Sequence, residues 1–253
     1  MSHFYEKLDS GEIILRDDVT TAPQARKDPQ RCLSSVTTKL HVLPNDFLDI
    51  WRIKEAAKIA RDDLDIPLDE IPKEVWGRRA NPAGVMIHSS DFGTTVHNHL
   101  EDACNALKNG VDHNAPEGWE KYVDPFMLHL FANCIEVLEC EFMVADHRTA
   151  GTIDLIVKGS DGLIELMDFK TRVGKAPGDI KTKAYDKDAA QMAVEAEIYM
   201  NDLSLSYLPR INSVLIDCIT GETHVKKWTV KAQAKGLNMF NYCSDFYDAH
   251  YGL

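Results

Sequence analysis

The sequence predicts an α/β (α+β) fold in which a mixed central sheet is flanked by helices, with a helical elaboration at its N-terminal side. Apolar residues recur at helical spacing in the first half of the chain, and short alternating runs typical of strands follow residue 137. A helical segment separates two strand pairs, an order expected of a mixed sheet with helices packed on it. The 253 residues are enough for one elaborated domain.

The first third of the chain is expected to hold an arm and then helices. Residues 1–33 are polar and lack sustained periodicity, so we expect a flexible N-terminal arm. Residues 46–61 have near-helical spacing and predict a helix, whereas the prolines within 62–82 indicate a loop with short helical pieces.

Two further helices are predicted before the sheet. Polar side chains at 89–91 can cap a helix that ends near Gly110. Its apolar stripe comprises Val96, Leu100, Ala103 and Leu107. The apolar run at 125–137 predicts a buried helix.

Strand patterns dominate the rest of the chain. A short strand is predicted at 140–144, and the runs at 151–158 and 162–170 are separated by Gly-Ser-Asp, which favours a hairpin. The remaining elements are a helix at 189–203, a strand pair at 213–219 and 223–230, and a last helix at 232–251. We therefore expect one domain at 34–253, mainly helical over 34–137 and with its sheet core over 138–253.

The charge and cysteine content limit the classes of function. A formal net charge of −12 argues against a protein that coats nucleic acid with its whole surface. Basic residues nevertheless gather between Lys170 and Lys187 and again between His224 and Lys235, where they can steer a phosphate backbone or simply form solvated loops. The six cysteines show no C-x-x-C spacing, so we expect buried, reduced thiols. Without a signal pattern or a run of roughly 18 apolar residues, we expect an intracellular, cytoplasmic protein with no membrane partner.

Three residues of the predicted hairpin indicate chemistry. Asp154 lies among apolar strand residues, where a carboxylate is costly unless a cation or a donor meets it. Asp168 and Lys170 share one face of the next strand, and the hairpin can bring Asp154 across to them. Two carboxylates and a lysine suit phosphodiester hydrolysis with Mg²⁺. The alternative is a buried ion pair that only stabilises the hairpin.

Four motifs follow one another in an order known from a nuclease family. They are FGTTVHNHLED at 92–102, GTID at 151–154, DFKTR at 168–172 and QMAVEAEIY at 191–199. Together they resemble the PD-(D/E)xK nuclease superfamily, and more narrowly its RecB-like branch, which includes the mitochondrial genome maintenance exonucleases. The resemblance covers about residues 85–250 and implies a restriction-endonuclease-like core.

The resemblance implies roles for individual residues. The metal ligands for Mg²⁺ or Mn²⁺ would be His97, Asp154, Asp168 and the backbone carbonyl of Phe169. Lys170 would be the catalytic lysine, and Gln191 would position the substrate or that lysine. Either residue alone also fits an ordinary role, His97 as a half-buried polar residue and Gln191 as a plain helix residue.

Further side chains complete the predicted site. Additional acidic residues near the metal would be Glu101 and Glu141, with Glu139 as the alternative to Glu141. Substrate contacts would come from Thr171, Arg172, Lys175, Lys181, Lys183 and Tyr199. The family tyrosine falls on Glu195 here, one turn before Tyr199, so the sequence departs from the pattern at that point. The late cysteines are not grouped as in the iron–sulfur relatives, so no iron–sulfur cluster is expected.

These residues lead to three hypotheses of function. The first is a metal-dependent DNA exonuclease acting on free, single-stranded ends in recombination, repair or replication, including that of a phage in its host's cytoplasm. Proteins of those processes would then be its partners. The second is a structure-specific endonuclease. The third is a nucleic-acid-binding protein that keeps the nuclease fold without catalysis.

Overall fold

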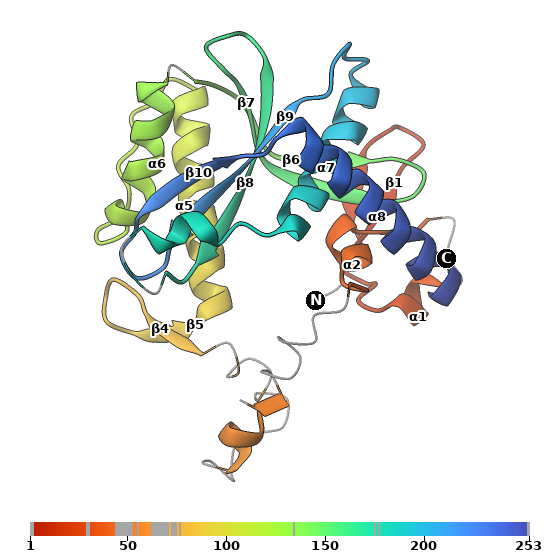
Figure 1. The fold of residues 1–253 in the computed structure, drawn as a ribbon, viewed down its shortest axis with the longest axis horizontal. Coiled ribbons are helices and arrows are strands. Elements are labelled where there is room, and N and C mark those ends of the chain that lie inside the picture. The colour runs from red at the N-terminus through yellow and green to blue at the C-terminus, as the bar shows by residue number, and fades with distance from the viewer. Residues whose placement is uncertain are drawn as a thin grey trace.

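A five-stranded mixed sheet flanked by helices forms the centre of the protein, so the α+β prediction is confirmed (Figure 1). The computed structural model describes residues 3–28, 31–43, 53–54, 56–61, 71, 75, 77–133, 135–174, 176 and 178–251. No helix within these ranges is both long and apolar enough to cross a membrane.

The central sheet has the strand order β10-β9-β8-β7-β6. Its strands are β6 (Glu136–Ala145), β7 (Ala150–Lys158), β8 (Ile164–Arg172), β9 (Arg210–Asp217) and β10 (Thr223–Lys227). Only β8 and β9 run parallel among these neighbours. Parallel strands need a crossover, and the chain makes it through the 3₁₀ turn η1 (Asp179–Thr182) and helix α7 (Asp186–Asp202).

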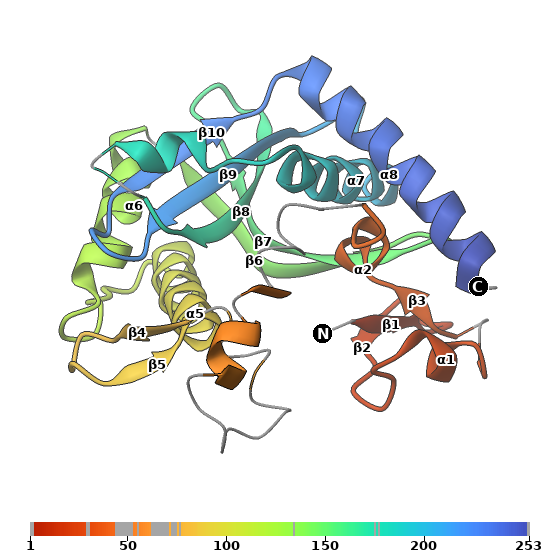
Figure 2. The same ribbon diagram turned by 60° about the horizontal axis from the view of Figure 1, so that its bottom comes forward.

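Helices cover both faces of this sheet (Figure 2). On one face lie α5 (Ser89–Lys108) and α6 (Glu120–Ala132), and on the other lie α7, α8 (Val230–Tyr251) and the short α2 (Val36–Leu40). Phe126 and Phe169 are among the buried side chains of the first layer, and Leu166 and Phe240 of the second. Each such side chain contributes about 1.5–3 kcal/mol of transfer free energy, so the two layers hold the sheet rigidly.

The N-terminal region is folded, contrary to the expected flexible arm. Its described residues form strands β1 (Phe4–Lys7), β2 (Ile13–Leu15) and β3 (Leu33–Ser34), and one helical turn, α1 (Ala22–Ala25). The Tyr5 hydroxyl lies 3.3 Å from Thr152 Oγ1, and Lys7 Nζ donates to the Ala145 carbonyl at 3.1 Å. Strands of two to four residues are too short to show periodicity, which is why the sequence pattern missed them.

The predicted elements of the core agree with the structure within a few residues, with three exceptions. The helix expected at 125–137 ends at Ala132, and its exposed Leu128 and Phe131 show that it is not fully buried. A small hairpin, β4 (Arg78–Ala80) and β5 (Met86–His88), begins within the expected loop at 62–82. The residues at 89–91 do not cap α5, because its N-cap is His88 and Ser89 Oγ donates to the Gly77 carbonyl.

Half of the helix expected at 46–61 lies outside the described residues. Those of its residues that the structure describes, 53–54 and 56–61, are helical.

Close contact between α7 and α8 yields a test of the packing. A Cβ added at Gly236 would lie 2.9 Å from Ala190 Cα and 3.0 Å from the Ala189 carbonyl oxygen. We expect Gly236→Ala to lower the free energy of unfolding by about 1–3 kcal/mol, because overpacking outweighs the better helix propensity of alanine. Urea denaturation measures it, with the exposed Asn238→Ala of the same helix as the control, expected to be near neutral. A gain of about 1 kcal/mol for Gly236→Ala would contradict the close approach.

Candidate active site

The candidate site lies where β7 and β8 part. Their antiparallel pairing stops at Leu155↔Met167, although β7 extends back to Ala150 and β8 runs on to Arg172 beside β9. Asp154 lies at this opening, and its Oδ2 accepts a hydrogen bond from the Phe169 amide at 2.6 Å. The Asp154 carboxylate thus satisfies a main-chain N–H of β8, and this hydrogen bond holds Asp154 beside the second half of that strand.

Asp168 and Lys170 lie on one face of β8, as the alternation predicted. Lys170 Nζ donates to Asp168 Oδ1 at 2.6 Å, and Gln191 Nε2 on α7 reaches the same oxygen at 3.5 Å. Asp168 is only 3% exposed, and its other oxygen, Oδ2, is buried with no hydrogen-bond partner among the described residues. An unpartnered carboxylate oxygen is costly to bury, which makes Oδ2 a position where a cation would be stabilised.

His97 reaches the same place from α5, on the opposite side of the sheet from α7. Its Nδ1 lies 3.8 Å from Asp154 Oδ2, and its ring meets the Phe169 ring edge to face at 5.8 Å. Burial lowers the pKa of His97 to about 4, and the ammonium of Lys170 adds to this effect. The imidazole is therefore neutral at pH 7 and keeps a lone pair available for a metal ion.

The buried carboxylates of the site have raised pKa values. Burial raises the pKa of Asp168 to about 6 against the opposing charge of Lys170. Burial likewise raises the pKa of Asp154. Burial alone would lower the pKa of Lys170, but Asp168 and Asp154 outweigh it and raise that pKa. Lys170 therefore stays an ammonium, and a further cation would offset the remaining negative charge.

A third carboxylate, Glu141 of β6, faces this cluster. The residues on either side of Glu141 pair with those on either side of Asp154, so the two carboxylates lie across from each other. Glu141 has a φ of +48°, a strained conformation for a residue with a side chain, of the order of 1–3 kcal/mol. Burial and then the charge of Asp154 raise its pKa to about 7. Its alternative, Glu139, instead pairs with Lys108 at 2.6 Å, while Glu101 is close enough to Asp154 to raise that residue's pKa.

Glu195 on α7 belongs to this environment and was not predicted. It is 2% exposed, and its Oε1 accepts from Gln191 Nε2 at 3.3 Å. A Cβ at Gly151 would lie 2.7 Å from that oxygen, so glycine is required there for the carboxyl to fit. Burial and then Asp168 raise the pKa of Glu195 well above its ordinary value. The sequence signal that could have identified Glu195 is its position four residues after Gln191, on an alanine-rich face of the same helix.

Only some of the residues predicted to contact the substrate lie near the candidate site. Tyr199 is buried at 5% exposure against the Phe142 ring, so it packs in the core and that prediction is wrong. Thr171 lies against Gly93 of α5, where an added Cβ would approach its Oγ1 to 2.8 Å. Arg172 follows on the same strand.

Arg172 is held in a fixed position. Its Nη2 donates to both carboxylate oxygens of Asp188 at 3.1 and 3.3 Å, and its guanidinium lies 5.4 Å from the centroid of the Tyr185 ring. Among the predicted lysines, Lys181 is exposed, Lys183 pairs with Asp179 at 3.4 Å, and Lys175 lies outside the described residues.

The donor set fits a hard divalent cation, although its side chains do not converge on a single point. Within the described residues, no three His, Cys, Asp or Glu side chains come close enough together to hold a metal ion. The hydrogen bonds explain this, because Asp154 is turned to the Phe169 amide and Asp168 to Lys170. The predicted carbonyl ligand at Phe169 stays a prediction, since the structure shows only its amide bonded to Asp154.

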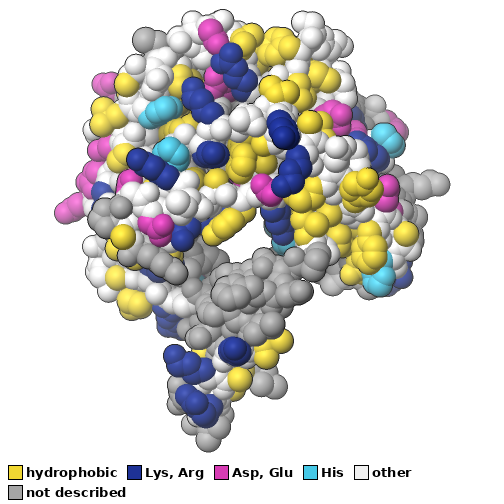
Figure 3. All heavy atoms as spheres, viewed as in Figure 1, with side chains coloured by type: hydrophobic (Ala, Val, Ile, Leu, Met, Phe, Trp, Pro, Cys, Tyr) yellow, Lys and Arg dark blue, Asp and Glu magenta, His cyan; other side chains and the backbone are white. Residues whose placement is uncertain are grey.

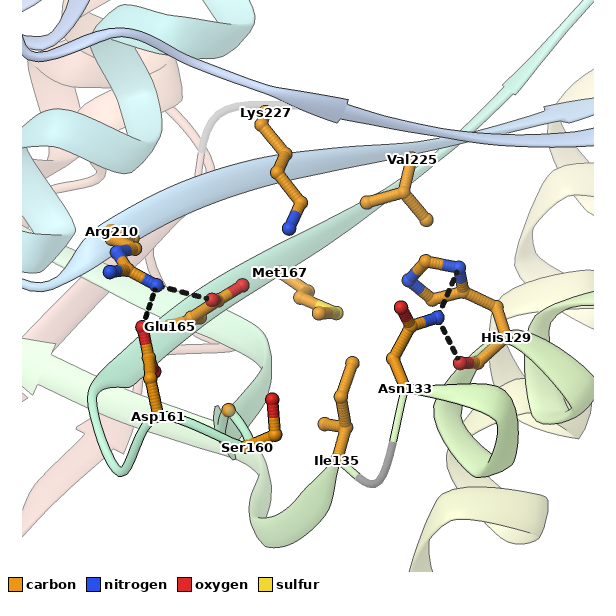
Figure 4. Close-up of a pocket in the computed structure, with 11 residues that line it drawn as sticks. His129, Asn133, Ile135, Ser160, Asp161, Glu165, Met167, Arg210, Val225 and Lys227 are labelled. Carbon is orange, nitrogen blue, oxygen red and sulfur yellow. Dashed lines mark hydrogen bonds and ion pairs between the residues drawn. The ribbon is translucent and has the colours of Figure 1, made fainter.

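A separate cavity lies at the other end of the hairpin (Figure 4). Its volume is about 150 Å³, and residues around the β7–β8 turn and His129 of α6 line it. Arg210 there pairs with Asp161 at 2.7 Å and with Glu165 at 3.2 Å. These ion pairs occupy Arg210, Asp161 and Glu165, although Lys227 also lines the cavity. The buried carboxylate oxygen of Asp168, unpartnered among the described residues, is the stronger indication of a site.

Comparison with known proteins identifies no family for this chain. No protein-family model matches the chain, and no curated protein matches it.

The charge of His97 provides a test of this geometry. We expect its imidazole to stay neutral until the pH falls to about 4, because its pKa is lowered from the usual 6.5. Lys170→Met should raise that pKa by removing the neighbouring cation, whereas Lys170→Arg and the distant Lys158→Met should not. NMR titration of the imidazole nitrogens measures it. A wild-type pKa near 6.5, or no response to Lys170→Met, would contradict the described surroundings of His97.

Proposed function

We propose that this chain is a metal-dependent DNA exonuclease of the PD-(D/E)xK type, which hydrolyses phosphodiester bonds from strand ends. The observation that carries the proposal is the meeting of Asp154, Asp168 and Lys170 where β7 and β8 part, with Asp168 Oδ2 buried and unpartnered among the described residues. An ion pair that only stabilised the hairpin would need neither His97 from α5 nor Gln191 from α7. That four separate motifs supply side chains to one place supports a site.

Each residue then has a physical role. Asp154, Asp168 and the neutral imidazole of His97 would hold Mg²⁺ or Mn²⁺. When bound, the ion would lower the pKa of a water molecule and neutralise charge on the phosphate. Lys170, fixed by Asp168, places a positive charge beside the scissile phosphate and can exchange a proton with the attacking water. Gln191 holds the orientation of Asp168.

Side chains beyond Lys170 fit a nucleic-acid backbone. Thr171 and Arg172 continue along β8 away from the metal-binding carboxylates, and Asp188 holds the Arg172 guanidinium in place. An arginine held in this way can present its remaining N–H groups to a phosphate. The face seen in Figure 3 carries scattered Lys and Arg side chains, while Asp and Glu gather along its left edge.

Digestion of end-labelled linear single-stranded DNA, beside a closed circle, tests the proposal. With Mg²⁺ or Mn²⁺ the linear strand should shorten from an end and the circle should survive, and chelation of the metal should stop the reaction. Lys170→Met should lower the rate by at least about 10²-fold, the lower range for loss of a proton-transferring group. Lys158→Met, at the opposite end of β7, is the matched control and should keep full activity.

The other outcomes identify the alternatives. Cleavage of the circle would replace the exonuclease with an endonuclease. Metal-independent binding of DNA without cleavage would replace the enzyme with a nucleic-acid-binding protein. Equal activity of Lys170→Met and wild type would contradict the proposed site.

A further inference from the structure

An exposed aromatic side chain lies at the end of β8, next to the candidate site. Tyr185 is 51% exposed and directly precedes the first residue of α7. The guanidinium of Arg172 lies over its ring, with Cζ 5.4 Å from the ring centroid. An aromatic ring that is supported by a cation and still half open to solvent can accept a second flat group by stacking.

Hydrogen bonds hold the tyrosine and the arginine together. The buried carboxylate of Asp188 accepts from the main-chain N–H of Tyr185 at 3.0 Å. Both oxygens of the same carboxylate accept from Arg172 Nη2, at 3.1 and 3.3 Å. Arg172 Nη1 also donates to the Thr171 carbonyl at 3.2 Å. The Tyr185 backbone and the guanidinium under its ring are therefore fixed before a ligand arrives, which lowers the entropic cost of stacking.

Contacts between α7 and β8 relate this pair to the metal-binding carboxylates. Asp188 and Gln191 are three residues apart on α7 and share one face of that helix. They contact Arg172 and Asp168 respectively, so these two residues lie on the same face of β8. Four residues of strand separate them, roughly 13 Å. A ligand held at the carboxylates reaches the tyrosine only if it extends along β8, as a strand of nucleic acid does.

We propose that Tyr185 stacks on a base of a single-stranded nucleic acid whose scissile phosphate lies at Asp154 and Asp168. Every base has a flat π-face, so such a contact positions the strand without selecting a sequence. In a duplex the neighbouring bases cover those faces, whereas the bases of a single strand can turn outward onto an aromatic ring. The inference rests on the proposed function, because it takes the class of substrate from it.

Binding of a fluorescent single-stranded oligonucleotide to the full chain, followed by anisotropy at low salt, tests the inference. EDTA is present, so that no strand is cut. Tyr185→Ala and Tyr185→Leu should each weaken binding by about 5- to 150-fold, the range for the loss of one stacked base. Tyr185→Phe keeps the ring and should restore tight binding. Tyr242→Ala removes a tyrosine of α8 that is 78% exposed, and it should bind as wild type does.

An abasic oligonucleotide of equal length separates stacking from a structural role. It keeps every phosphate but offers no base, so wild type and Tyr185→Ala should bind it equally. If the defect of Tyr185→Ala persisted on the abasic strand, Tyr185 would act by supporting Arg172, and the stacking inference would be overturned. It would be overturned as well if wild type did not bind the normal strand, or bound it no more tightly than Tyr185→Ala and Tyr185→Leu.

The digestion assay with Mg²⁺ or Mn²⁺ is independent of this measurement. A base-dependent effect of Tyr185 without cleavage by wild type would contradict only the nuclease proposal. Cleavage by wild type without a base-dependent effect of Tyr185 would contradict only the stacking inference.

Discussion

The hydrogen bond from the Phe169 amide to Asp154 Oδ2 is the contact on which the candidate site depends. It forms where the β7–β8 ladder stops, so the two strands stay joined by a side chain while their backbones separate. The separation opens a position that residues from α5 and α7, on opposite faces of the sheet, can both reach. If the ladder continued, Asp154 would lie in an ordinary strand pair, and His97 and Gln191 would have no common target.

Several features of this position are unfavourable for stability alone. Asp168 buries an oxygen without a partner among the described residues, Glu141 has left-handed backbone geometry, and Glu195 is a buried acid whose pKa is strongly raised. Backbone strain and shifted pKa values cluster at functional sites. A purely structural ion pair, by contrast, is most stable when all its carboxylate oxygens are hydrogen-bonded. A divalent cation would offset the electrostatic part of these costs, by giving Asp168 Oδ2 a partner and adding positive charge beside the carboxylates.

Much of the core could be predicted, because its elements are long or carry clear turns. The hairpin of β7 and β8 followed from alternation about Gly-Ser-Asp, and its geometry brings Asp154 to β8 as expected. The small N-terminal sheet could not be found, because its strands are too short for a period to show. Its docking through Tyr5 depends on a residue 147 positions away. Long-range contacts of this kind leave no local pattern.

The candidate site, like the core, could be predicted in part from the sequence. Spacing on one strand is enough to place Asp168 beside Lys170, but it does not tell which face of α7 meets the sheet. That face brings Gln191 and Glu195 to the site and sends Tyr199 into the core. The positive φ of Glu141 likewise has no signal in its sequence neighbours.

The central claim is that Asp154, Asp168 and His97 bind one divalent cation. A crystal of the protein grown with Mn²⁺ tests it directly, through anomalous scattering from the ion. The account predicts a peak within coordination distance of Asp168 Oδ2 and an oxygen of Asp154, with His97 turned toward it, and no such peak in crystals of Asp168→Asn. Full Mn²⁺ occupancy elsewhere with this position empty, or an equal peak in Asp168→Asn, would contradict it.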